Sequence, residues 1–220
     1  MRPPRKVVSR SPHRRVGYIV CPWLQSDPIG YESLLEAGFV RIAALCPNVL
    51  KIRHQPFRLE LGDGLGSYTP DFYLDCRGAR GVVVEVKPFG HIRKHLAKLQ
   101  AAQSHLENHN CDFLVCTEAE IYHDERADRA SAILRYARSI VPEEKVATLA
   151  TRLLNLSYPA SASDLAGQLG ISVEQVLYFV GRRYLQVGRD LSIECIEQCM
   201  EKGNGNGNFS ARAWFGGASW

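Results

Sequence analysis

Residues Ser67–Pro88 read SYTPDFYLDCRGARGVVVEVKP, and this stretch decides the fold of the chain. Two apolar runs flank a Gly/Arg turn, a pattern that predicts an antiparallel β-hairpin. Alternate side chains of a strand point to opposite faces, so one face carries Asp71, Glu85 and Lys87. Folding at the turn places Asp71 across from residues 85–87. The opposite, apolar face is predicted to hold the hairpin in a sheet through Phe72, Leu74, Val84 and Val86.

Two carboxylates that converge in one site repel each other and are costly to desolvate. A divalent cation removes this conflict, and carboxylate oxygens with water suit Mg²⁺ or Mn²⁺. A lysine beside them can contact a phosphate oxygen or the attacking water. The hairpin therefore indicates metal-assisted phosphodiester hydrolysis. A cross-strand ion pair on an exposed sheet face would use the same residue types, and the hairpin alone leaves that alternative open.

The length and composition describe a globular chain of 220 residues, enough for one large or two small domains. No apolar run approaches about 18 residues, so we expect no transmembrane helix. The basic N-terminus has no apolar core behind it, so no secretory signal is expected. The seven cysteines are odd in number and lack a CxxC spacing, which favours reduced thiols in a cytoplasmic protein.

The net charge of +4 is concentrated at the N-terminus, where six Lys and Arg residues precede residue 20, so the remainder carries −2. Residues 1–20 are therefore predicted to form a flexible basic arm that contacts DNA or RNA. A disordered solubilising leader is the alternative.

Helical spacing predicts a first helix that starts with Asp27 as cap and Pro28 in the first turn, and ends at Cys46–Pro47. The other elements expected in the predicted nuclease domain, residues 21–141, are one or two strands over 49–61, a helix over 91–107, a strand over 111–121 and a helix over 125–140.

Residues 142–200 are predicted to form a small winged-helix domain. Gly170 supplies the turn between two helices, and Ser172 with Gln175 forms a capping box. A hairpin with a Gly-Arg-Asp turn would be the wing. Such domains bind DNA or dock proteins, and Glu174 on the would-be recognition helix weakens the DNA case. The candidates for phosphate contact are Arg182, Arg183 and Arg189.

Residues 201–220 are a Gly/Asn linker followed by an aromatic tail, which we expect to be disordered when alone. Aromatic residues in such a tail suit a peptide that docks in a partner's groove. A free chain end is the alternative. The docking candidates are Phe209, Trp214, Phe215 and Trp220.

The order Pro70–Asp71 followed by Glu85-x-Lys87 is the signature of the PD-(D/E)xK nuclease superfamily. The segments ESLLE, HQPFRLEL, YTPDFYL and VVVEVKP follow one another between Tyr31 and Pro88. Together they resemble the TnsA endonuclease family, which are subunits of heteromeric cut-and-paste transposases. The resemblance implies an α/β restriction-endonuclease-like core, a mixed sheet flanked by helices, followed by a winged helix.

The resemblance also implies the site residues. Glu32, Asp71, Glu85 and Lys87 would be catalytic, and the metal ligands would be Glu32, Asp71, Glu85 and the carbonyl of Val86, holding Mg²⁺ or Mn²⁺. Glu36 lies one turn after Glu32 on a similar face. On the next helix, His91 and His95 suit either a metal pair or a phosphate-facing surface. The DNA contacts expected there are Arg93, Lys94 and Lys98.

The partners implied are double-stranded DNA at transposon ends, a TnsB-like DDE-type transposase and a TnsC-like AAA+ ATPase regulator. The chain would cut the 5′ strand in a bacterial cytoplasm, on the nucleoid when active, with no membrane partner. A freestanding restriction or repair endonuclease and a non-catalytic DNA-binding adaptor are the alternatives. The first should cleave DNA alone, whereas the second should not bind the metal.

Overall fold

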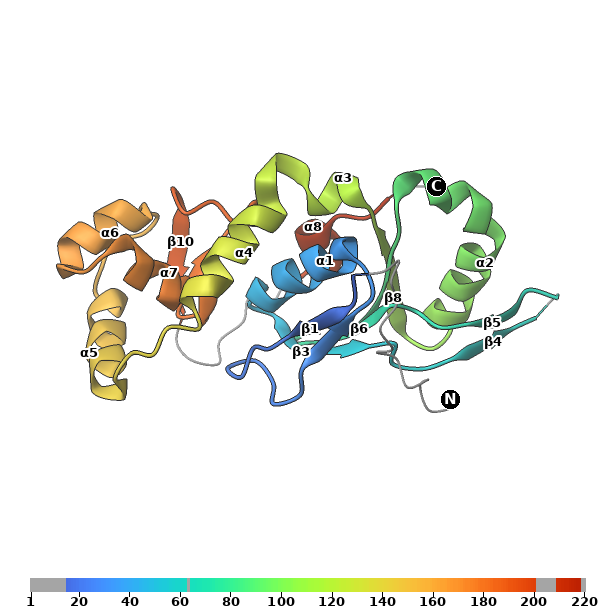
Figure 1. Cartoon of the computed structure of the whole chain (residues 1–220), viewed down its shortest axis with the longest axis horizontal. Helices are drawn as coiled ribbons and strands as arrows, with labels where there is room; N and C mark the ends of the chain where they lie inside the picture. Colours follow the sequence, from blue (N-terminus) through green and yellow to red (C-terminus); the bar gives the residue numbers. More distant parts are fainter. Residues whose placement is uncertain (1–14, 63, 201–208, 219–220) are drawn as a thin grey trace.

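The computed structural model describes residues 15–62, 64–200 and 209–218, and its centre is a four-stranded mixed sheet (Figure 1). The predicted basic arm lies outside these residues except for Arg15 and the residues after it. The sheet order is β3 (Val49–His54), β6 (Phe72–Cys76), β7 (Gly81–Val86) and β8 (Cys111–Cys116). β3, β6 and β7 are antiparallel neighbours, whereas β7 and β8 are parallel and are joined through α2 (Phe89–Glu107).

The predicted hairpin is confirmed. β6 pairs with β7 so that Phe72 lies opposite Val84 and Leu74 lies opposite Val82. Gly78 in the connecting turn has a φ of 66°, a conformation that costs glycine least. This register places Asp71, directly before β6, next to Glu85 near the end of β7.

Both faces of the sheet are buried. Phe72 and Val84 belong to a large core that also includes Phe39 of α1 (Leu34–Leu45). On the other face, Val83 and Phe113 pack in a smaller core with residues of α2. Only the end of the hairpin therefore leaves room for a polar site, rather than the whole of one face.

The first helix begins later than the sequence predicts. Ile29–Tyr31 forms β2 and pairs with β1 (Gly17–Ile19), so the expected start at Asp27 and Pro28 is wrong. α1 instead begins at Leu34, because the side chain of Ser33 accepts a hydrogen bond from the backbone N–H of Glu36. A second two-stranded ribbon consists of β4 (Leu59–Leu61) and β5 (Gly66–Tyr68).

The chain turns into helices directly after β8. Thr117 and Glu120 form a capping box that ends the strand and starts α3 (Glu118–Ile121), so the expected strand to residue 121 is five residues too long. A short 3-10 turn (His123–Glu125) leads into α4 (Arg126–Tyr136).

The C-terminal half of the fold, residues 142–200, contains three helices and a two-stranded ribbon. Gly170 adopts a φ of 68° between the second and third helices, and Ser172 with Gln175 forms the predicted capping box. The third of these helices packs closely on α4, since a Cβ at Gly181 would lie 2.5 Å from the Cβ of Ala137. The elements are α5 (Glu143–Leu154), α6 (Ala162–Leu169), α7 (Val173–Gly181), β9 (Leu185–Val187) and β10 (Ile196–Cys199).

Arg183 joins this half to the sheet, and its predicted phosphate contact is therefore wrong. Its guanidinium donates to the carbonyl of Ala44 at 2.8 and 3.0 Å and to that of Val49 at 2.6 Å. Burial lowers its pKa to about 10, which still leaves it charged at neutral pH. Ala44 lies in the last turn of α1, where a cation favourably meets the helix dipole.

The C-terminal segment folds back onto the chain itself. Phe215 in α8 (Ala211–Phe215) is 2% exposed and lies 5.5 Å from the ring of Phe39. The N–H of Ala218 donates to Val115 at the outer strand of the sheet. Docking of Phe215 in a partner is thus wrong, because its own core buries it. Phe209 and Trp214 are also partly buried there, whereas Trp220 and the linker 201–208 lie outside the described residues.

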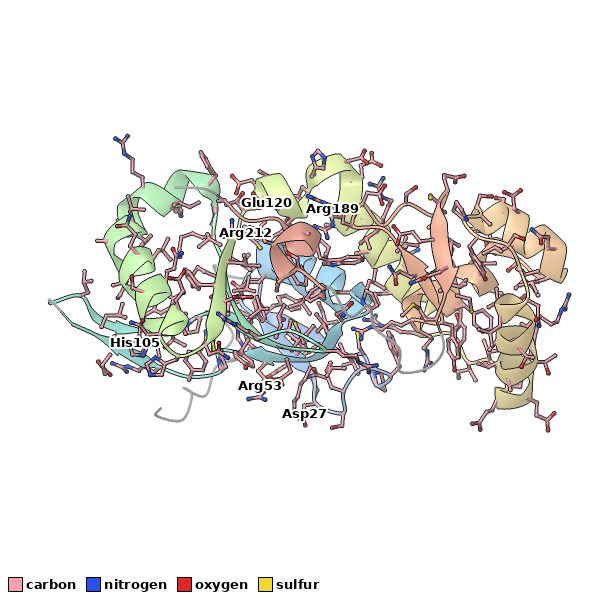
Figure 2. All side chains as sticks on the ribbon, turned by 180° about the vertical axis from the view of Figure 1, so that it is seen from behind. Asp27, Arg53, His105, Glu120, Arg189 and Arg212 are labelled. Carbon is pink, nitrogen blue, oxygen red and sulfur yellow. The ribbon has the colours of Figure 1, made fainter. Side chains whose placement is uncertain are left out.

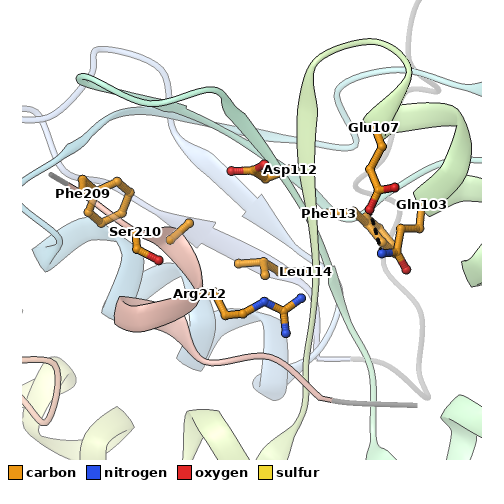
Figure 3. A pocket seen from close by; sticks show the side chains of 9 residues that line it. Gln103, Glu107, Asp112, Phe113, Leu114, Phe209, Ser210 and Arg212 are labelled. Carbon is orange, nitrogen blue, oxygen red and sulfur yellow. Dashed lines mark hydrogen bonds between the residues drawn. The ribbon is translucent and has the colours of Figure 1, made fainter.

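Figure 1 shows α8 beside α1 and β8, far along the chain from both. The tail and α2 border a hollow of about 320 Å³ along β8 (Figure 3). Gln103 and Glu107 of α2 hydrogen-bond to each other on its far side. None of the helices in the described part of the chain combines the length and apolarity that a membrane crossing requires.

We predict that Arg183→Ala destabilises the fold by about 3 kcal/mol, because it leaves buried carbonyls without a donor. For a chain of this size the melting temperature should fall by about 6–12 °C. Arg135→Ala, a change of an exposed arginine of α4, is the control and should shift it by less than 2 °C or so. Equal melting temperatures for the two variants would contradict the structural role of Arg183.

Candidate active site

Asp71 and Glu85 lie side by side where β6 and β7 separate. The backbone N–H of Val86 donates to Oδ2 of Asp71 at 2.8 Å, which fixes that carboxylate against the next strand. A hydrogen bond from the backbone N–H of Gln55 to the Asp71 carbonyl, at 2.8 Å, ties it to β3 as well. Asp71 is thus held by backbone groups from both neighbouring strands.

Glu85 is 5% exposed, and both of its oxygens have partners. Nζ of Lys87 lies 2.7 Å from Oε1, and the hydroxyl of Tyr68 donates to Oε2 at 2.7 Å. Tyr68 belongs to the β4–β5 ribbon, so this ribbon reaches directly into the site. The sequence pattern brought Glu85 and Lys87 together, but it gave no signal for Tyr68.

The site carries an excess of negative charge. Burial, followed by the charges of Glu85 and Glu36, raises the pKa of Asp71 well above its ordinary range. The hydrogen bond from Val86 and the charge of Lys87 act in the opposite direction but do not cancel these effects. Asp71 therefore lacks a sufficient counter-charge within the protein.

The acid that reaches the site from α1 is Glu36. Glu32 lies before the helix, whereas Glu36 is buried in its first turn and its charge acts on Asp71. Oε2 of Glu36 accepts from the backbone N–H of Glu32 at 2.7 Å, and Oε1 accepts from the Ser33 hydroxyl at 2.9 Å. Burial nevertheless raises the pKa of Glu36. Because α1 begins at Leu34, the expected position of Glu32 on the helix is wrong, and its catalytic role stays a prediction.

His54 adds no counter-charge. Its Nε2 lies 3.8 Å from Oε2 of Glu36 and has no hydrogen-bond partner among the described residues. Burial lowers the pKa of His54 to about 4, so the ring is neutral at neutral pH. His54 therefore offers these carboxyl groups no positive charge.

A hollow of about 240 Å³ opens over Glu85 and Lys87. His95 and Lys98 of α2 line it, so these two residues of the predicted basic helix face the site. Arg93, Lys94 and His91 are exposed and lie outside its lining. The remaining lining residues are Ser67, Tyr68, Thr69 and Leu99.

The donor chemistry fits a hard divalent cation. Asp71 and Glu85 are neighbouring, largely desolvated carboxylates with one lysine to balance them, a combination that Mg²⁺ or Mn²⁺ stabilises. Across the described ranges, no group of three or more His, Cys, Asp or Glu side chains is arranged to hold a metal. A cation here would therefore depend on backbone carbonyl and water ligands besides these two carboxylates.

The comparison with known families bears on this geometry. Residues 46–118, about a third of the chain, match the family model described as TnsA-like endonuclease N terminal. This segment is similar to the N-terminal domain of TnsA-like endonucleases. It contains Asp71, Glu85 and Lys87, together with all four strands of the central sheet. The match confirms the resemblance and indicates nuclease activity. No curated protein matches the chain.

We predict that Tyr68→Phe raises the Mg²⁺ concentration needed for half-maximal cleavage by about tenfold or more, because Glu85 is the expected metal ligand and loss of a ligand's hydrogen-bond partner weakens metal affinity to that extent. The variant keeps the ring packed near Phe113 but leaves Oε2 of Glu85 without its donor. The measurement is the Mg²⁺ concentration that gives half-maximal DNA cleavage. Tyr73→Phe on β6 is the matched control, and an equal effect of both changes would argue against the assignment.

Asp71→Asn should stabilise the protein at neutral pH. Because burial and neighbouring carboxylates raise the pKa of Asp71 in the fold, stability falls as pH rises from the ordinary aspartate pKa towards the raised value. Removing the charge should raise the melting temperature by about 2–4 °C for each kcal/mol regained. Thermal melts at pH 5 and pH 7.5 test this expectation.

In those melts, the advantage of the Asp71→Asn variant should be larger at the higher pH. Added Mg²⁺ should raise the melting temperature of the wild type more than that of the variant. If the variant melts at a lower temperature than the wild type at pH 7.5, the charge of Asp71 does not destabilise the fold.

Proposed function

We propose that the chain is a metal-dependent DNA endonuclease that cuts the 5′, non-transferred strand at transposon ends, as the TnsA-like subunit of a cut-and-paste transposase. The observation that carries the proposal is the group Asp71, Glu85 and Lys87 within the TnsA-like segment. A structural ion pair would not need a second carboxylate whose pKa is raised by the first.

Each residue of the site has a distinct task in this proposal. Asp71 and Glu85, with the carbonyl of Val86, would hold Mg²⁺ or Mn²⁺. Such a cation, when bound, polarises the phosphoryl group and lowers the pKa of a bound water. Lys87 contacts the scissile phosphate or positions the attacking water. Its present bond to Glu85 keeps the ammonium inside the site.

Glu36 takes the place that the sequence assigned to Glu32. Its carboxylate is buried and acts electrostatically on Asp71, so in this proposal it adds negative charge beside the cation. His95 and Lys98 border the hollow and would bind the phosphates beside the cut. Arg93 and Lys94 would contact DNA farther from it.

We further propose that residues 142–200 act as a winged helix. The helices α5 to α7 and the β9–β10 ribbon have the order that this module requires. Arg189, in the connection between β9 and β10, is exposed near the C-terminal segment and remains a candidate for phosphate contact (Figure 2). A DDE-type transposase and an AAA+ ATPase are the proposed partners, on the strength of the TnsA-like match.

The test is a strand-cleavage assay on end-labelled DNA that carries the ends of the element, with Mg²⁺ and with or without the partner proteins. The wild type should cut the 5′ strand, and the partners should raise the rate. Asp71→Ala should abolish cleavage while DNA binding persists. Asp75→Ala, four residues farther along in β6, is the control and should retain activity because Asp75 pairs with Arg53 away from the site.

Cleavage by the Asp71→Ala variant at the wild-type rate would overturn the proposal. Efficient, site-specific cutting of both strands by the chain alone would instead favour a freestanding endonuclease.

A further inference from the structure

A third pocket lies where β1 meets the ends of α4 and α7, in the region that joins the two halves of the chain. Its volume is about 350 Å³. Of the described residues that line it, two are arginines and none is acidic. They are Tyr18, Val20, Pro22, Trp23, Arg138 and Arg182.

Arg182 is held in a fixed position. Its Nε donates to the carbonyl of Ala137 at 2.7 Å, and its guanidinium lies over the rings of Trp23 and Tyr178, 4.7 and 5.1 Å from their centroids. These contacts restrict a side chain that otherwise loses much entropy on binding. Its two terminal Nη groups make no hydrogen bond to another described residue, so they form a preorganised donor pair.

Arg138 supplies a second positive charge. Its side chain is exposed and makes no hydrogen bond or ion pair within the described residues. Two guanidinium groups in one pocket repel each other unless an anion lies between them. The pocket also presents uncovered apolar surface, since Tyr18 is 57% and Val20 is 46% exposed.

The neighbouring sequence indicates which anion fits. The six basic residues before residue 20 lead directly into β1, and no acid occurs among them. A single carboxylate of a protein partner would neutralise the charge of the pocket but not the basic residues that precede β1. A DNA backbone offers many phosphates in a row, and a guanidinium binds a phosphate through two parallel hydrogen bonds.

We infer that this pocket is a DNA-binding site in which Arg182 and Arg138 together bind one backbone phosphate. The inference rests on the proposed function in that DNA is the substrate, but it concerns a site separate from Asp71 and Glu85. The sequence predicted Arg182 as a phosphate contact of the winged helix. In the structure its guanidinium bonds to Ala137 at the end of α4 and lines a pocket together with residues of and after β1.

The test is equilibrium binding of the full chain to a fluorescent 30-base-pair duplex in EDTA, at several salt concentrations. Arg138→Ala should weaken binding about tenfold at low salt and reduce the slope of log K against log[salt] by about one. Arg182→Lys keeps the charge but loses the paired donors, so it should weaken binding to a similar extent. Melting curves verify that each variant is folded.

Arg135→Ala is the matched control, because it removes the same charge near the same end of α4 without lining the pocket. It should leave affinity and slope close to those of the wild type. Wild-type affinity and slope in Arg138→Ala would overturn the inference, and so would equal losses in Arg135→Ala.

The same assay is repeated with a glutamate-rich peptide. If Arg138→Ala loses binding to this peptide but keeps wild-type binding to DNA, the pocket belongs to a protein partner and the inference is overturned. The binding assay contains EDTA and therefore does not depend on cleavage. A failure of the wild type to cleave DNA in Mg²⁺ would refute the proposed function but leave these binding results unchanged.

Discussion

The repulsion between Asp71 and Glu85 is the constraint on which the rest of the structure depends. Two neighbouring strands hold these carboxylates together, and a third, Glu36, approaches from α1. The protein supplies Lys87, the hydroxyl of Tyr68 and one backbone N–H against them, and His54 stays neutral. A fold selected for stability alone would place apolar residues here. This crowding of carboxyl groups supports the proposed cation site.

The remainder of the chain keeps this site in place. Phe72 and Val84 fix the strands from one face, and Val83 with Phe113 fix them from the other. Arg183 connects α1 and β3 to the C-terminal helices, so the helix that carries Glu36 is anchored at its opposite end. The C-terminal segment adds a further restraint, because Ala218 bonds to the outer strand and Phe215 packs on α1. Segments distant in sequence therefore stabilise one short hairpin.

Local pattern predicted much of this arrangement. The hairpin, its register, α2 and the Ser172 cap followed from alternation and turn residues, which act over a few positions. The pairing of Asp71 with Glu85 followed from the register as well. What failed depends on distant contacts. The start of α1 was missed because β2 pairs with β1, and Tyr68 reaches Glu85 only through a separate ribbon. Arg183 and Phe215 were taken for exposed residues because no local pattern shows burial by segments far along the chain.

The central claim is that Asp71 and Glu85 share a divalent cation whose binding relieves their repulsion. Calorimetric titration of Mn²⁺ into the chain with bound DNA, in two buffers of different ionisation enthalpy, tests it most directly. Binding should release protons, because the cation displaces the proton that a raised pKa retains on Asp71. Asp71→Asn should abolish both heat and proton release. The absence of Mn²⁺ binding by the wild type, or unchanged binding by the variant, would contradict the account.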